Sequence, residues 1–235
     1  MDPREPLPSA AAHAFVADLV APALDDEDTH HLERVLRLRP GQAVTVSDGD
    51  GRWRSCVWRA GGELEATGPV VARPRPDPVI TVAFALTKGE RPEWVVQKLT
   101  EVGVDRIRPF RAERSVVRWD EAKAAAQVAR LRRVARQAAM QSRRVHLAEV
   151  ADVTDFPAVA AGAASRAGLA APGGGPPGLD RPTLLVGPEG GWSDGELACG
   201  LPLVGLGSTV LRAETAAVSA GVLLCGLRDR IIGTN

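Results

Sequence analysis

The sequence predicts an α/β protein with a small N-terminal β domain and a larger domain built on a mainly parallel sheet. Short strand candidates cluster around an Asp-Gly hairpin signal at residues 48–51. Beyond a proline run at 74–78, strand and helix signals alternate, which is typical of βαβ units. A chain of 235 residues is long enough for two unequal domains.

The N-terminal domain is predicted to be a small β-barrel at residues 1–73. Its strand candidates are 43–47, 53–58, 63–66 and 70–71, and a helix is expected from His30 to Leu38. Trp53 and Trp58 lie five residues apart, so in a strand they face opposite ways. We expect one of them in the core and the other available to stack on a base.

A linker is expected at residues 74–78, where Pro74, Pro76 and Pro78 alternate with other residues. Alternate prolines remove backbone donors and restrict the residues before them, so neither a helix nor a central strand can continue. The larger domain is therefore assigned to residues 79–235.

The larger domain has the following elements in order. A buried strand is expected at 79–86, a helix from Arg91 to Gly103 with Pro92 near its start, and a second strand at 106–110. A long helix at 120–141 and a third strand at 145–149 follow.

Glycine, alanine and proline dominate residues 158–181. This composition predicts a short strand at 167–170 and a disordered loop at 172–177, within a segment 171–181 whose order is open. Ser193 and Glu196 match a capping box that opens a helix, and the last helix is expected at 214–224.

Bulk properties favour a soluble cytoplasmic protein. No apolar run reaches roughly 18 residues, and no basic-then-apolar leader is present. The 3 cysteines lack CxxC spacing, which argues against a disulfide or zinc framework.

The number of basic residues, Lys+Arg 29, equals the number of acidic residues, Asp+Glu 29, which argues against a strongly basic nucleic-acid-binding surface. Arginine supplies most of the positive charge, and either RNA contact or compositional bias explains that excess.

Two glycine-bearing loops, at 184–191 and 204–216, each follow an apolar strand. In an open α/β sheet, ligands bind beyond the carboxyl ends of strands, and glycine lets backbone groups approach them. Neither a Walker pattern nor a complete G-x-G-x-x-G is present. The pair therefore predicts one pocket, and its acid at Glu189 suits a neutral or cationic ligand.

These loops carry G-P-E-G-G followed by L-G-x-x-V-L-R-x-E-T-A, a combination that resembles the RsmE family, which methylates N3 of a uridine in 16S ribosomal RNA. Further matches, in the same order along the chain, are R-V-L-R with P-G-Q at 34–42, K-G-E-R at 88–91, Q-K-L-T-E-V-G-V at 97–104 and E-R at 113–114. The resemblance spans about residues 28–224.

The resemblance implies a SPOUT-type trefoil-knotted sheet, an N-terminal PUA-like RNA-binding barrel, a homodimer and S-adenosylmethionine as cofactor. Residue signals alone predict an ordinary doubly wound sheet, because threaded chains are nearly absent from proteins. The implied cofactor-binding residues are Leu185, Gly187, Pro188, Glu189, Gly190, Gly191, Leu206, Gly207, Val210, Leu211, Arg212, Glu214, Thr215 and Ala216.

Methylation of uridine N3 needs removal of a weakly acidic proton and stabilisation of the resulting charge. Arg212 is the candidate for stabilising the uracil carbonyls, with Glu189 or Glu214 as the base. An ion pair between Arg212 and Glu214 that merely holds the loop is an equal alternative. Met140 stands where family members often carry an acid, so that position cannot supply the base.

Target recognition is expected to depend on arginines. Arg34 and Arg37 are expected on one side of a helix, a spacing that can grip adjacent phosphates. The full set of RNA-binding candidates is Arg34, Arg37, Lys88, Arg91, Arg114, Arg143 and Arg144.

Other classes of function and site have weaker support. His30 and His31 lack a third ligand at a useful spacing, so no metal site is expected. A non-catalytic RNA-binding ribosome assembly factor would keep the arginines and the barrel but would not need the glycine loops. A nucleotide-binding enzyme of another class would not need the N-terminal barrel.

Overall fold

The computed structural model describes residues 6–117, 119–163 and 166–233. The chain divides into two compact units, of which the first comprises residues 1–76 with 137–147 and the second comprises 77–136 with 148–235. The sequence prediction assigned 137–147 to the larger domain. These residues join the first unit because Ala139 and Met140 are buried in its core, and because the Val145 carbonyl accepts hydrogen bonds from Gly51 N and Ser47 Oγ.

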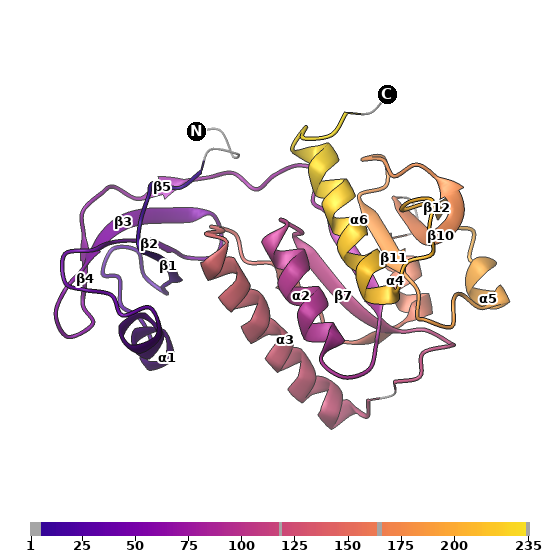
Figure 1. Ribbon diagram of the computed structural model, residues 1–235, viewed down its shortest axis with the longest axis horizontal. Coiled ribbons are helices and arrows are strands. Elements are labelled where there is room, and N and C mark those ends of the chain that lie inside the picture. The colour runs from indigo at the N-terminus through magenta and orange to yellow at the C-terminus, as the bar shows by residue number, and fades with distance from the viewer. Residues whose placement is uncertain (1–5, 118, 164–165, 234–235) are drawn as a thin grey trace. The chain divides into compact units, whose positions relative to one another are not determined.

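The first unit holds a mixed sheet in the order β1-β2-β3-β4, with β5 beside β3 (Figure 1). Its described strands are β1 (Ala12–Phe15), β2 (Ala43–Ser47), β3 (Arg52–Trp58), β4 (Leu64–Ala66) and β5 (Val71–Ala72). β1 pairs with β2 in parallel and the other pairs are antiparallel. β1 was not predicted, because its residues are all buried and show no alternation of apolar and polar side chains.

Trp53 and Trp58 point to opposite sides of β3, and both are buried, with 5% and 2% of their surface exposed. Trp58 belongs to the main cluster of this unit, whereas Trp53 packs with Leu7 and Val145. The expectation that one tryptophan is available for a base is therefore wrong, because both sides of β3 are covered.

The helical segment of the first unit begins and ends earlier in the chain than predicted. α1 (Asp26–His30) is capped by Asp25, whose carboxylate accepts a hydrogen bond from Asp28 N, and a π-helical turn at His31–Val35 follows. Arg37 lies beyond this turn in the left-handed region, with φ +52°. Arg34 and Arg37 thus do not share a helix face, which corrects the prediction.

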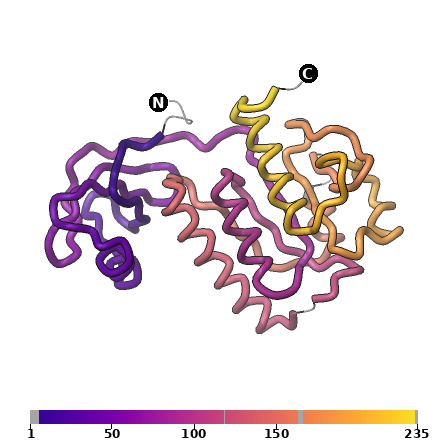
Figure 2. The backbone as a smooth tube through the Cα atoms, viewed as in Figure 1, coloured from indigo at the N-terminus to yellow at the C-terminus, as the bar shows by residue number. Residues whose placement is uncertain are grey.

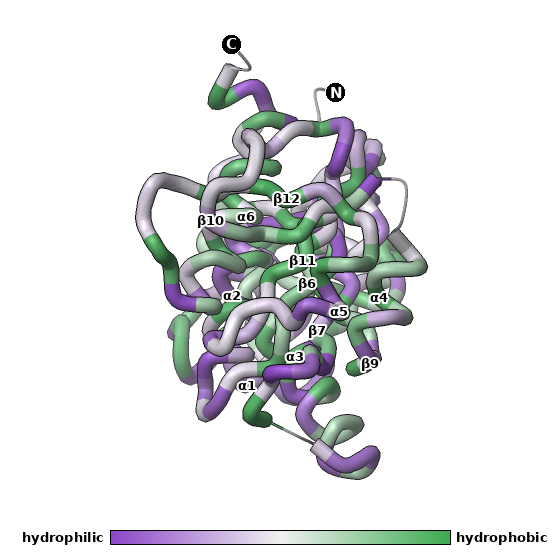
Figure 3. Tube along the Cα trace, turned by 90° about the vertical axis from the view of Figure 1, so that its right-hand side faces the viewer, coloured by the Kyte–Doolittle hydropathy of each residue, from purple (hydrophilic) through white to green (hydrophobic). Residues whose placement is uncertain are grey.

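The second unit is built on a sheet whose described pairings are all parallel, in the order β12-β10-β11-β6-β7-β8 with β9 beside β7. Its described strands are β6 (Thr81–Ala85), β7 (Arg106–Arg111), β8 (Glu149–Val150), β9 (Thr154–Asp155), β10 (Ala167–Gly175), β11 (Thr183–Val186) and β12 (Leu203–Val204). The central strands β6 and β11 are apolar after the threonine at their first position (Figure 3). Such strands are typical of a sheet covered on both faces.

The helices of the second unit confirm most of the predicted alternation of strands and helices. They are α2 (Arg91–Glu101), α3 (Glu121–Gln141), α4 (Phe156–Ala163), α5 (Asp194–Leu197) and α6 (Ala213–Arg228). Pro92 lies in the first turn of α2, and Ser193 with Glu196 forms the predicted capping box of α5. α4 is absent from the sequence prediction, because alanine, glycine and proline dominate the chain from residue 158 onward and give no clear helical pattern.

Two strand predictions are corrected. The third strand of the sheet is β8 at 149–150, not 145–149, because residues 145–147 bond to the first unit. The loop predicted at 172–177 is largely strand, because β10 continues to Gly175 beside β12. A Cβ at Gly174 would lie 2.6 Å from the backbone of Leu203 and Val204, so glycine here permits close strand contact.

α6 lies against α2, as the yellow and magenta segments of the second unit show (Figure 2). A Cβ on Gly221 would lie 2.8 Å from Leu99 of α2, so a side chain at this position would push the helices apart. The end of α6 is fixed by Arg228, whose Nη1 lies 2.6 Å from Asp105 Oδ2. The same carboxylate oxygen accepts a hydrogen bond from Ile80 N, so it joins α6 to the start of the sheet.

Within the described residues, no helix has the length and apolar character needed to cross a membrane. Among these described residues, no three or more His, Cys, Asp or Glu side chains lie close enough together to hold a metal ion.

Arg228→Met is expected to lower the free energy of unfolding by about 3–5 kcal/mol, because it removes the buried positive charge that neutralises the Asp105 carboxylate. Asp105 is 1% exposed and Arg228 5%. Urea denaturation measures the change. Arg106→Met, which removes an exposed ion pair with Glu149, is the control and should cost about 0–1 kcal/mol. Equal costs for both variants would contradict the anchoring role of Arg228.

A pH dependence is expected in the first unit. Burial lowers the pKa of His13 from 6.5 to about 4, and its ring nitrogens lie within hydrogen-bond distance of Thr45 Oγ1 and the Arg144 carbonyl. Above pH 6.5 His13 is neutral in both the folded and the unfolded chain, so the free energy of unfolding has its full value. As the pH falls toward 4, the unfolded chain takes up the proton first, and the free energy of unfolding decreases by about 3 kcal/mol. Urea unfolding between pH 4 and 7 tests this; His13→Gln should flatten the profile, and an unchanged profile would exclude His13 as the source.

Candidate functional site

A cavity of about 410 Å³ opens at the carboxyl ends of β11 and β12, beside the middle of β10. Three segments form it: the middle of β10 at 170–172, residues 186–192 at the end of β11 and in the loop that follows, and residues 206–213 in the loop after β12 up to the start of α6. The two glycine loops predicted from the sequence therefore meet at one cavity, where open parallel sheets bind their ligands.

Most of the predicted binding residues line this cavity: Gly187, Pro188, Glu189, Gly191, Leu206, Gly207, Val210, Leu211, Arg212 and Ala216. Four predicted residues, Leu185, Gly190, Glu214 and Thr215, are not in its lining. The lining residues that sequence reasoning missed are Ala170, Ala171, Pro172, Val186, Trp192, Thr209 and Ala213. Those of β10 gave no usable signal because their segment resembles a loop in composition.

The loop after β11 is shaped around Trp192. A Cβ on Gly187 would lie 3.0 Å from the indole ring, and Gly191 adopts φ +70° while its N–H bonds to the Pro188 carbonyl at 2.9 Å. Trp192 Nε1 donates to the Ala170 carbonyl at 2.9 Å, and its ring stacks on Phe110. The indole thus joins the loop to β10, and glycine is required where the loop folds over it.

Arg114 and Glu196 hold this loop from outside. Arg114 Nη1 donates to the Trp192 carbonyl at 2.8 Å and to the Gly190 carbonyl at 3.4 Å. The buried Glu196 carboxylate accepts from Ser193 N and Glu113 N, each at 2.9 Å. A guanidinium and a carboxylate therefore satisfy backbone groups that the irregular loops leave unpaired.

Arg91 links both glycine loops. Its Nη1 lies 2.6 Å from Glu189 Oε1 in the first loop, and its Nε lies 3.7 Å from Glu214 Oε1 at the start of α6. Glu214 is only 15% exposed on its side chain, and its second oxygen is buried without a hydrogen-bond partner among the described residues. The ion pair considered for Arg212 and Glu214 is thus supplied by Arg91 instead. Arg212 lines the cavity as the residue that precedes α6.

The remaining RNA-binding candidates have the following positions. Arg34 is exposed in the π-helical turn, and Lys88 is exposed between β6 and α2. Arg143, with φ +56°, donates to the Ala10 carbonyl within the first unit, and Arg144 in the same unit is half-buried. Their contacts with RNA stay a prediction.

Comparisons with known proteins agree with this geometry. Residues 74–224 match a family model described as RNA methyltransferase domain, and residues 24–57 match one described as RNA methyltransferase PUA domain. Together the fold and the cavity define an RNA methyltransferase with an N-terminal PUA domain. The α/β prediction with a PUA-like first unit is confirmed, whereas the trefoil knot stays a prediction.

The chain is 35% identical over 229 residues to ribosomal RNA small subunit methyltransferase E of Mycobacterium bovis, covering 84% of this chain and 83% of the relative. It belongs to the ribosomal RNA small subunit methyltransferase E family. The structure resembles that family's member from Neisseria gonorrhoeae, solved with S-adenosyl methionine, at TM-score 0.75 and 26% identity, covering 89% and 94% of the two chains. A Legionella pneumophila protein with bound SAM gives TM-score 0.77 and 28% identity, covering 90% and 96%.

Proposed function

We propose that this protein transfers a methyl group from S-adenosylmethionine to N3 of a uridine in 16S ribosomal RNA, acting in the cytoplasm as a homodimer. The observation that carries the proposal is the cavity formed jointly by both glycine loops and residues 170–172 of β10. The related structure from Neisseria gonorrhoeae has the same fold and contains S-adenosyl methionine.

The residues of the cavity fit this cofactor. Its volume of about 410 Å³ lies in the range of small-molecule sites. Leu206, Val210 and Leu211 supply apolar contacts, and the glycines expose backbone amides and carbonyls that can bond an adenine edge. Glu189 adds a carboxylate to the lining, and its negative charge would favour the cofactor's positive sulfonium. When bound, the cofactor supplies an electrophilic methyl group.

Arg212 and Glu189 are the side chains proposed to act on the uracil. Removing the N3 proton leaves negative charge on the ring carbonyls, which the Arg212 guanidinium can stabilise. Glu189 lines the cavity and is 40% exposed, whereas Glu214 lies outside the lining and is nearly enclosed. Of the two predicted bases, Glu189 therefore has the better access to a bound substrate.

Calorimetry with S-adenosylmethionine and with ATP separates the rival classes of function. The proposed enzyme binds the former and not the latter, a nucleotide-binding enzyme of another class does the reverse, and a non-catalytic RNA-binding ribosome assembly factor binds neither. Nucleoside analysis of small-subunit RNA from cells with and without the gene then locates the modification. A modified N3 blocks Watson–Crick pairing and stops reverse transcription.

Arg212→Ala is expected to lower the turnover of methylation by at least about 100-fold, because one charge-stabilising donor is lost. Circular dichroism should show an unchanged fold, since Arg212 precedes α6 and lies outside its hydrophobic core. Turnover is measured on small subunits from cells that lack the gene. Turnover equal to that of the unmodified protein would remove Arg212 from the mechanism.

Arg91→Ala is expected to weaken S-adenosylmethionine binding about tenfold, because both glycine loops lose their shared guanidinium. Calorimetry measures the affinity, and Arg106→Ala, an exposed arginine paired at the start of β7, is the matched control.

The same variant separates this role from the RNA contact predicted for Arg91. A phosphate contact would instead reduce RNA affinity and lower its salt dependence, with cofactor affinity unchanged.

Combining Arg91→Ala with Glu189→Gln should reduce the free energy of S-adenosylmethionine binding by less than the sum of the two single changes, because each removes the same ion pair. Strict additivity would contradict the link.

A further inference from the structure

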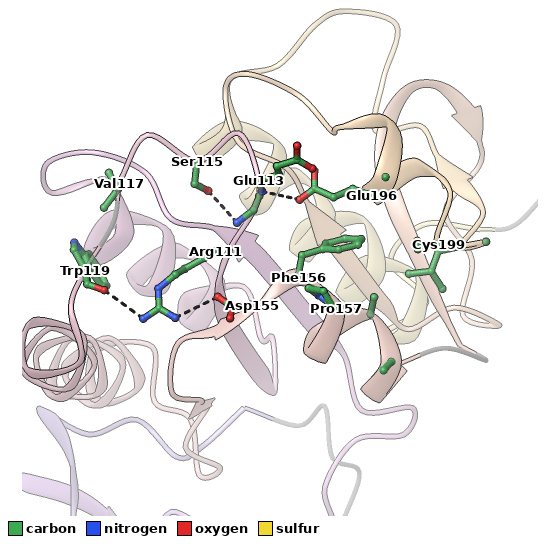
Figure 4. A pocket seen from close by; sticks show the side chains of 16 residues that line it. Arg111, Glu113, Ser115, Val117, Trp119, Asp155, Phe156, Pro157, Glu196 and Cys199 are labelled. Carbon is green, nitrogen blue, oxygen red and sulfur yellow. Dashed lines mark hydrogen bonds and ion pairs between the residues drawn. The ribbon is translucent and has the colours of Figure 1, made fainter.

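The second unit contains another cavity, of about 880 Å³, which the proposed chemistry does not use (Figure 4). It lies among the segment that follows β7, the start of α4, and α5 with the residues after it. Phe156, Pro157, Ala160 and Leu201 give it apolar walls.

The two cavities share an aromatic wall. Trp192 lines the first and Phe156 lines the second, and their ring centroids are 5.5 Å apart. Both cavities lie where parallel strands end, the first after β11 and the second after β7. A polymeric ligand with one group in the first cavity can therefore place a second group in the second cavity.

Polar groups of both kinds line the second cavity. Arg111 is held by Asp155 Oδ1 and the Trp119 carbonyl, each at 3.3 Å, contacts that use only part of its five N–H donors. The Ser115 oxygen accepts from Ala112 N at 3.1 Å, and its hydroxyl proton can be donated elsewhere. Glu113 adds an exposed acceptor. Donors and acceptors between apolar walls match a nucleobase, which has apolar faces and polar edges.

Charge decides which part of a nucleotide fits. The lining carries Glu113, Asp155 and Glu196 against Arg111, so positive charge is not in excess. Phosphates are bound by clusters of Arg and Lys, and this cavity does not provide one within its described lining. A neutral base can enter while its phosphates stay outside.

We propose that this second cavity binds an unpaired base of the RNA substrate, other than the base that is methylated. The inference rests on the proposed function. The methylated base must meet the methyl donor in the first cavity, and the Trp192 and Phe156 rings separate that place from the second cavity. The second cavity thus reads a neighbouring nucleotide and contributes to the choice of target.

Cys199 provides a direct test. It lines the cavity and is exposed, whereas Cys56 and Cys225 are buried, so a maleimide should label Cys199 first. Small subunits purified from cells that lack the gene should slow this labelling about tenfold, and S-adenosylmethionine alone should not. Mass spectrometry of peptides locates the label, and Cys199→Ser provides the blank.

A filled cavity provides the second test. Ala161 is exposed and lines the cavity, and Ala158 is exposed on the same helix but does not line it. Ala161→Trp should raise the KM for small subunits about tenfold, because an indole occupies the place of the base, with cofactor affinity unchanged. Ala158→Trp is the matched control and should match the unmodified protein.

The outcomes separate the two proposals. If the unmodified protein neither binds S-adenosylmethionine nor methylates the subunits, the proposed function fails. If it does both, the second proposal alone fails in any of three cases: labelling continues at the same rate with subunits present, Ala161→Trp leaves KM unchanged, or Cys199 is already unreactive in the free protein because a second copy covers it. Protection by an arginine-rich peptide and not by subunits would likewise overturn it in favour of a protein partner.

Discussion

The close packing of α6 against α2 and the sheet is the constraint on which the site depends. Ala217, Ala220 and Gly221 of α6 are buried, and a side chain at Gly221 would move the helix away from Leu99. The buried Arg228–Asp105 pair fixes the other end of the helix. Because the loop after β12 runs directly into α6, the position of the helix determines where Arg212 and Glu214 lie.

The glycine loops have little regular structure of their own, so side chains from other segments supply the missing order. Arg91 links the two loops, and Arg114 binds backbone carbonyls at the end of the first. Glu196 binds the backbone amide of Ser193, directly after that loop, and the amide of Glu113, in the segment after β7. Such groups are costly if left unpaired in a partly enclosed place. Residues that first suggest RNA contact or acid–base chemistry thus also have a structural role.

Sequence reasoning succeeded where local pattern and final environment agree. The apolar run of β6, the capped α2 and the Ser193 capping box carry their own signals, and the glycine motifs located the cavity. It failed where tertiary contacts decide. Gly174 suggests a loop but permits close strand pairing, and the end of α3 has a normal helical pattern although its residues from 137 onward pack in the core of the first unit. The second cavity has no motif, because distant segments assemble it.

The arginine content also has a different meaning once contacts are known. Arg106, Arg111, Arg130 and Arg132 each form an ion pair with a carboxylate of the second unit. Such exposed pairs add little stability, but each cancels positive charge that could otherwise attract phosphate. An RNA enzyme with no net charge then cannot depend on bulk attraction for its target. Selection of the RNA target then depends on binding sites whose shape and polar groups fit a particular nucleotide. A cavity can recognise a base in this way, whereas a basic surface recognises only phosphate.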